Sequence, residues 1–212
     1  MSNLKGQPVD TIFNMTERCI AAVFMRSDHS FAFLLDALRH DDWRVRYAAA
    51  VALGFRPRGE IAVAMGFRPS AEAIAPLMEA VDREDAAPLF SQAGELGEIP
   101  AGANTPYSIT FPDGATEETI EAWRRRGRLK QAVILTLGRI GLPDPGVLQR
   151  LHRYALDQAQ DYSVRAAANK ALGQIADPSS LPIVRQAMND EETCTVMEAT
   201  RSAAIIGGDV QA

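Results

Sequence analysis

The sequence predicts an all-α protein, an α-solenoid of about four helix pairs with an N-terminal capping helix and one long loop insertion. Residues 42–54 and 161–173 share the pattern Asp-x-x-Val-Arg-x-x-Ala-x-x-Ala-Leu-Gly, and related helical segments recur every 32 to 35 residues outside two inserted segments. Helices so rich in alanine have too little apolar surface to form a core alone. We therefore expect them to stack on neighbouring copies.

Each position of this pattern has a mechanical role in a helix. The Asp accepts hydrogen bonds from free backbone N–H groups at the helix start, and the Val and Leu supply the buried stripe. The final glycine permits the left-handed turn that ends a helix, which predicts such a turn at Gly54 and Gly173.

The first elements in the chain are a capping helix and one complete repeat. Apolar residues at mostly helical spacing predict a helix over 8–26 that closes the end of the stack, with Cys19 in the core. Residues 30–40 predict the first helix of repeat one. Asp41 and Asp42 then make the turn into a second helix over 43–53.

A short duplication precedes the second repeat. The sequence Gly-Phe-Arg-Pro occurs at 54–57 and again at 66–69, and it predicts two turns that expose Phe55 and Phe67. Both phenylalanines are candidate partner contacts. The first helix of repeat two then begins near Ala71.

A long insertion, residues 85–122, interrupts the second repeat between its two helices. Its many glycines and prolines predict an ordered loop, and residues 107–111 favour a short strand. Long ordered loops often carry function, so Tyr107 and Phe111 are further candidate partner contacts. The second helix resumes near Thr116 or Thr119 and runs through Gly138.

The last two repeats follow without interruption. Repeat three runs from 144–156 into the helix that contains Val164, and repeat four pairs 181–188 with 196–206. All of residues 1–212 are therefore assigned to one domain.

These repeats resemble the HEAT-like repeats of the phycobilisome-lyase type. The resemblance covers about residues 30–208 outside the insertion, and it is weak in repeat four, where Thr193 and Met197 occupy the acid and Arg positions. In that family the repeated acid and arginine form a structural ladder. The resemblance therefore implies a structural ladder made by these four residues: Asp42, Arg46, Asp161 and Arg165.

The resemblance allows several functions. The family includes scaffolds, bilin lyase subunits, bilin-detaching factors and hydroxylases that hold iron through His-Glu pairs. No histidine here precedes a glutamate, which argues against the hydroxylase. Our leading hypothesis is a non-catalytic protein–protein interaction scaffold or accessory subunit of a complex, with the inner surface of the second helices as docking face. The alternative is a bilin (phycobiliprotein) lyase subunit or chromophore-handling factor, although no residue identifies a tetrapyrrole site.

Composition points to protein partners. The net charge of −5 argues against general nucleic-acid binding. The only cysteines, Cys19 and Cys194, are too few for a disulfide framework or a zinc site. We see no signal peptide and no uncharged run of about 18 residues, so we expect a cytoplasmic protein without membrane insertion. No cofactor or metal is predicted.

A basic run at 123–130 is the other candidate contact surface. Its members are Trp123, Arg124, Arg125, Arg126, Arg128 and Lys130. They can bind phosphate or an acidic partner, or they can neutralise the acidic insertion beside them. Paired carboxylates elsewhere fall at helix starts and turns, where acids favour the helix dipole, and no nucleophile or phosphate-loop motif occurs. Catalysis is therefore not predicted.

Overall fold

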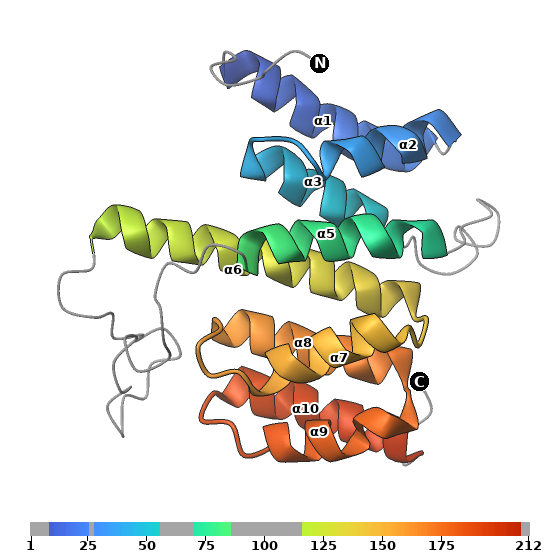
Figure 1. The fold of residues 1–212 in the computed structure, drawn as a ribbon, viewed down its shortest axis with the longest axis vertical. Helices are drawn as coiled ribbons and strands as arrows, with labels where there is room; N and C mark the ends of the chain where they lie inside the picture. The colour runs from blue at the N-terminus through green and yellow to red at the C-terminus, as the bar shows by residue number, and fades with distance from the viewer. Residues whose placement is uncertain (1–8, 26–27, 56–69, 86–115, 209–212) are drawn as a thin grey trace.

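The computed structural model describes residues 9–25, 28–55, 70–85 and 116–208. These residues form α-helices and short 3-10 turns and contain no strand, so the predicted all-α solenoid is confirmed for the described chain (Figure 1). The α-helices are α1 (Val9–Met25), α2 (Asp28–Ala37), α3 (Trp43–Leu53), α5 (Ile74–Asp85), α6 (Glu117–Ile140), α7 (Pro145–Leu156), α8 (Tyr162–Ile175), α9 (Leu181–Ala187) and α10 (Thr193–Gly207). The 3-10 turns η1 (Ala71–Ala73) and η3 (Pro178–Ser180) lead into α5 and α9.

Four helix pairs stack along the long axis of the molecule (Figure 1). The first, or A, helices are α2, α5, α7 and α9, and the second, or B, helices are α3, α6, α8 and α10. Each B helix packs on the next, so that α3, α6, α8 and α10 form a continuous layer. The α1 helix packs on α3 and α2 at the start of this layer, where its Cys19 is fully buried.

The insertion predicted at 85–122 lies between α5 and α6. The last residue of α5 is Asp85, and α6 begins at Glu117, close to the helix start predicted near Thr116 or Thr119, so the final residues of that range are helical. The extra first turns of α6, residues 117–126, precede the part of the helix that matches α3 and α8. The predicted strand at 107–111 and the turn at 66–69 lie outside the described residues.

The three inner B helices share one register. When Gly54, Gly138 and Gly173 are aligned, the buried positions of α3, α6 and α8 coincide. The matched core residues are Val45, Leu129 and Val164; Ala48, Ala132 and Ala167; and Ala49, Val133 and Ala168. The same sequence pattern therefore produces the same buried face in each repeat.

The prediction of left-handed turns at the repeat glycines is wrong. Gly54 has a φ of −89°, and the left-handed residue that ends α8 is Ala176, with a φ of 56°. Gly138 and Gly173 lie inside their helices. The backbone conformation at these positions therefore does not require glycine.

Close approach of the next B helix explains the repeat glycines instead. A Cβ on Gly173 would lie 2.3 Å from Ser202 Oγ, and a Cβ on Gly138 would lie 2.7 Å from Ala171 Cβ. At Gly54 the nearest atom would be Thr136 Oγ1, at 2.2 Å. Only a residue without a side chain leaves room for the neighbouring helix at these points.

Two buried hydroxyl groups use this close approach to join B helices. Thr136 Oγ1 in α6 donates to the Ala50 carbonyl of α3 at 2.8 Å. Ser202 Oγ in α10 donates in the same way to the Asn169 carbonyl of α8 at 2.8 Å. Each accepting carbonyl lies four residues before a repeat glycine, so the glycine and the hydroxyl form one recurring contact.

We expect Gly173→Ala to destabilise the fold although alanine favours helices. Overpacking against Ser202 should outweigh the gain of about 1 kcal/mol in helix propensity and lower the free energy of unfolding by about 1 to 2 kcal/mol. Urea denaturation measures this change. The double variant with Gly173→Ala and Ser202→Gly should lose less unfolding free energy than the sum of the losses in the two single variants. An unchanged or more stable Gly173→Ala protein would show that the helices are not held together at this glycine.

Candidate functional site

An arginine near the start of α3 joins repeat one to repeat two. Arg46 NH1 donates to the carbonyl groups of His40, at 2.9 Å, and Asp41, at 2.7 Å, in the turn of its own repeat. Its NH2 donates to Glu84 Oε1 of α5 at 2.7 Å, and both side chains are nearly buried. One guanidinium therefore holds its own turn and the A helix of the next repeat.

Arg165 makes the equivalent contacts between repeats three and four. It donates to the Gln160 carbonyl of its own turn at 2.7 Å. It also forms a bidentate pair with Asp190, with distances of 2.8 and 3.0 Å, and only 5% and 2% of the two side chains are exposed. Burial raises the pKa of Asp190, but hydrogen bonds from Arg165 and the Glu192 backbone outweigh it, so the pKa lies below its ordinary value.

Lys130 occupies the matching position of α6 and joins repeats two and three. Its Nζ lies 2.6 Å from Asp85 Oδ1 and 3.0 Å from Gln160 Oε1. The sequence pattern missed this residue because the motif was read as Val-Arg, whereas α6 has Leu129 and Lys130. Alignment on Gly138 would have found it.

The repeated acids do not pair with the repeated arginines as a ladder of all four residues would require. Asp42 Oδ1 accepts a hydrogen bond from the Arg44 backbone N–H at 2.8 Å, and Asp161 Oδ1 accepts one from Ser163 N–H at 2.7 Å. Both acids therefore cap the start of their helix. The carboxylates that receive Arg46 and Arg165 come from the next repeat, from residues the pattern did not include.

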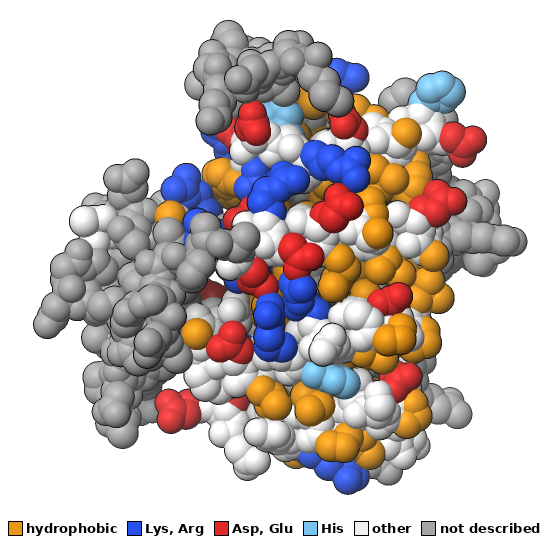
Figure 2. Space-filling model, viewed as in Figure 1, with side chains coloured by type: hydrophobic (Ala, Val, Ile, Leu, Met, Phe, Trp, Pro, Cys, Tyr) orange, Lys and Arg blue, Asp and Glu red, His pale blue; other side chains and the backbone are white. Residues whose placement is uncertain are grey.

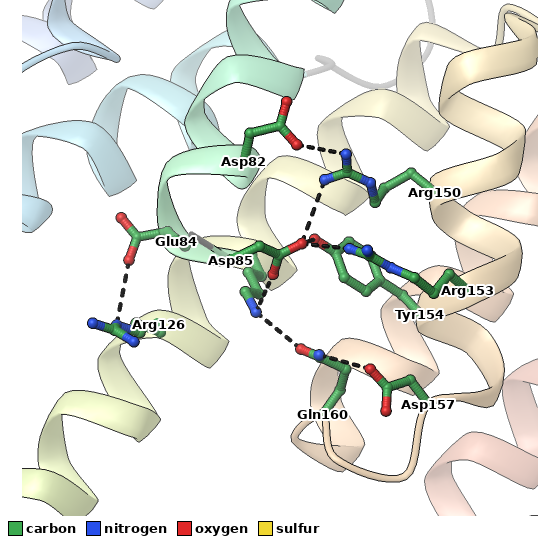
Figure 3. Close-up of polar contacts among 10 residues, drawn as sticks. Asp82, Glu84, Asp85, Arg126, Arg150, Arg153, Tyr154, Asp157 and Gln160 are labelled. Atoms are coloured by element: carbon green, nitrogen blue, oxygen red, sulfur yellow. Dashed lines mark hydrogen bonds and ion pairs between the residues drawn. The ribbon is translucent and has the colours of Figure 1, made fainter. Parts of the chain in front are cut away.

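The largest polar cluster surrounds Asp85, the last residue of α5 (Figure 3). Tyr154 OH donates to Asp85 Oδ2 at 2.6 Å, and Arg153 NH2 donates to the same oxygen at 2.5 Å. Arg150 approaches this oxygen to 3.4 Å, and Lys130 holds the other one. This arrangement fastens the end of α5 to α6 and α7.

The Asp85 cluster is a structural joint rather than a centre for acid–base chemistry. Burial raises the pKa of Asp85, but hydrogen bonds from Lys130 and Tyr154 outweigh it, so the pKa lies below its usual range. The carboxylate thus stays ionised at neutral pH. Burial also raises the pKa of Tyr154, so the phenol keeps its proton. Neither group is poised to exchange a proton near pH 7.

The described side chains of the basic run extend from different sides of α6. Arg126 reaches to 3.9 Å from Glu84, which already binds Arg46, and Arg125 is half-buried. Arg128 is exposed. Trp123 and Arg124 lie in α6, but their side chains are outside the described part, as are Phe67, Tyr107 and Phe111 of the other candidates. Whether the run neutralises the insertion therefore stays a prediction.

A row of apolar side chains follows the exposed side of α3. Tyr47 and Val51 are four residues apart on one side of α3, and Phe55 follows two residues after the end of the helix; the three side chains are 40%, 40% and 39% exposed. Trp43 continues the row, its ring packing edge-to-face on Tyr47 with centroids 6.3 Å apart. Of these four residues, the sequence analysis had selected only Phe55.

The shared register extends this row into a surface over three helices. We define the B-helix face as Arg44, Tyr47 and Val51 of α3, Phe55 just beyond its end, and the equivalents of these four exposed positions in α6 and α8. It comprises Arg44, Tyr47, Val51, Phe55, Arg128, Gln131, Leu135, Arg139, Ser163, Ala166, Lys170 and Gln174. All twelve are exposed or half-buried. Two predicted contacts, Phe55 and Arg128, therefore lie on one face, and aligning the repeats would have added the others.

In the described part of the chain, no helix is long and apolar enough to span a membrane. The same residues contain no group of three His, Cys, Asp or Glu side chains placed to bind a metal ion. Cys19 offers no nucleophile at neutral pH, because burial raises its pKa to about 11.

Comparison with known families detects HEAT repeats in two parts of the chain. A model for HEAT repeats matches residues 152–212, which cover most of repeats three and four. A HEAT repeat model also matches residues 31–55, which form repeat one. No curated protein matches the chain. The more specific resemblance to the phycobilisome-lyase type stays a prediction.

We predict that Asp190→Asn lowers the free energy of unfolding at pH 7 by about 2 to 4 kcal/mol, because Arg165 is left buried without a charged partner. The folded-state pKa of Asp190 is depressed, so its stabilisation is complete above the ordinary Asp value of about 4 and is lost as pH falls below it. Denaturation of both proteins from pH 7 to 3 should show the difference shrinking at the acidic end. A constant difference would contradict this account of the pair.

Tyr154→Phe tests the Asp85 joint. The variant loses one hydrogen bond to a carboxylate that keeps its cationic partners, so we expect a loss of about 1 to 2 kcal/mol in unfolding free energy. Tyr47→Phe removes an exposed hydroxyl and is the matched control, with an expected change within about 0.5 kcal/mol. Equal stability of the two variants would show that the Tyr154 hydroxyl does not stabilise the joint.

Proposed function

We propose that this protein is a non-catalytic interaction scaffold or accessory subunit that binds a partner protein on its B-helix face. The observation that carries the proposal is the exposed row of Tyr47, Val51 and Phe55 on α3. Aromatic side chains are enriched in protein interfaces, and tyrosine is among the residues that supply most of the binding energy at their centres. The HEAT repeats detected in the chain support this class of function.

The packing beneath the face favours a binding role. Consecutive B helices approach closely at glycines, and buried hydroxyl groups join α6 to α3 and α10 to α8, so the exposed sides of the B helices keep a constant relation to each other. A surface that is ordered before binding loses little conformational entropy when a partner docks. The α-solenoid therefore presents the row on a preorganised platform.

The polar clusters support a scaffold rather than an enzyme. The carboxylates of Glu84, Asp85 and Asp190 are each bonded to cations from a neighbouring helix. These groups explain how the repeats are held together, and they need no substrate to account for them. The alternative of a bilin lyase subunit rests on the resemblance alone, so we do not propose it.

Replacing two residues of the row tests the proposal. We expect Tyr47→Ser combined with Val51→Ser to reduce capture of the partner from a lysate of the native source at least about tenfold, because hot-spot residues are lost. Met188→Ser is the matched control, since Met188 is 39% exposed on another part of the surface. Circular dichroism checks that all variants are folded. Unchanged capture by the double variant, or equal losses in both proteins, would place the docking site elsewhere.

A further inference from the structure

The B-helix face is basic although the protein as a whole is acidic. Its twelve positions contain four cations and no carboxylate, whereas the chain carries a net charge of −5. The cations are Arg44, Arg128, Arg139 and Lys170. The face therefore differs in charge from the rest of the molecule.

The side of the molecule that carries α5 and α7 has a different distribution of charge from the B-helix face. There, basic and acidic side chains lie next to one another (Figure 2). Arg39 pairs with Glu79 at 3.1 Å, and Arg150 pairs with Asp82 at 2.5 Å. Charges on that side are balanced by neighbours within the chain, and this is the common state of a solvated surface.

The cations of the B-helix face are placed around the apolar row. Arg139 NH1 donates to the Gly54 carbonyl at 3.0 Å, which positions its guanidinium next to Phe55 at one end of the row. Arg44 is at the opposite end of α3. Arg128 takes the same register position in α6, and it is exposed.

Two of these cations have acidic neighbours that do not belong to the face. Arg44 pairs with the helix-capping Asp42 at 2.7 Å. Lys170 lies 3.8 Å from Glu198 of α10, and both side chains are partly exposed. An exposed pair of this length contributes little stability, so the lysine remains able to interact with a partner.

We infer that the B-helix face binds an acidic, amphipathic helical segment of a partner protein. This inference rests on the proposed function and names the chemistry of the partner. Tyr47 in α3 and Phe55, two residues past its end, are eight residues apart, which at the rise of a helix is about 12 Å, or slightly more than two turns. A partner helix with apolar residues at i, i+4 and i+7 covers that length, and acidic residues beside them meet the surrounding cations.

A protein segment fits this face better than nucleic acid does. Nucleic-acid surfaces draw most of their affinity from many phosphate contacts, whereas this face offers four cations. Phosphates would also leave the exposed side chain of Val51 and the half-buried side chain of Leu135 without an apolar counterpart. An amphipathic helix satisfies both the charges and the apolar row.

Selection from a displayed library of random 16-residue peptides tests the inference. We expect the enriched peptides to carry excess Asp and Glu around aromatic or aliphatic anchors at helical spacing. Their affinity for the protein should fall about tenfold when the salt concentration is raised from low to physiological, because charge attraction is screened. Enriched peptides without excess acid, or no enrichment at all, would overturn the inference.

Reversing the charge of single residues tests whether the selected peptides bind to the B-helix face. Arg128→Glu should weaken the selected peptides at least about tenfold, Arg128→Lys should largely restore binding, and Arg185→Glu on exposed α9 should have no effect. Equal effects of the two reversals would overturn the inference. So would a short DNA duplex that binds more tightly than the peptides and loses affinity with Arg128→Glu. If partner capture needs Tyr47 and Val51 while acidic peptides fail, the proposed function stands and only this inference is wrong.

Discussion

The close packing of consecutive B helices at the repeat glycines is the constraint on which the rest of the structure depends. Because no side chain separates them at Gly54, Gly138 and Gly173, α3, α6, α8 and α10 form a continuous layer. That layer sets the register in which core residues align. The layer also aligns the residues that face away from the core. The contacts on the buried side of the B helices therefore produce an exposed surface shared by several helices.

The charged joints act at the other end of the same helices. Each cation near the start of an inner B helix reaches the next repeat: Arg46 and Arg165 bind its carboxylates Glu84 and Asp190, and Lys130 binds Gln160 there and Asp85 of its own repeat. Removing a buried charge from water costs about as much as its pairing returns, so such joints add little net stability, whereas removing one partner leaves the other charge buried and unpaired. In repeat four, Met197 stands at the position that matches Arg165, and it is 66% exposed.

The sequence was sufficient to predict the helices but not the contacts between them. Helix starts and buried stripes depend on local spacing and capping, which is why the helix at 43–53 has the predicted ends. The roles of Gly173 and Lys130 depend on Ser202 and Asp85, which lie far away in sequence. The sequence therefore predicts turns at the glycines, and the exposed side of the apolar row at Tyr47 and Val51 is recognised only when the repeats are aligned on one another.

Site-specific photo-crosslinking tests the central claim that the shared exposed side of the B helices is the docking face. A photoreactive amino acid replaces Gln131, at the centre of the face, or Gln186, an exposed residue of α9. In cells of the native source, we predict a discrete crosslinked partner from position 131 and none from position 186. A partner crosslinked from position 186 but not from position 131 would contradict the account.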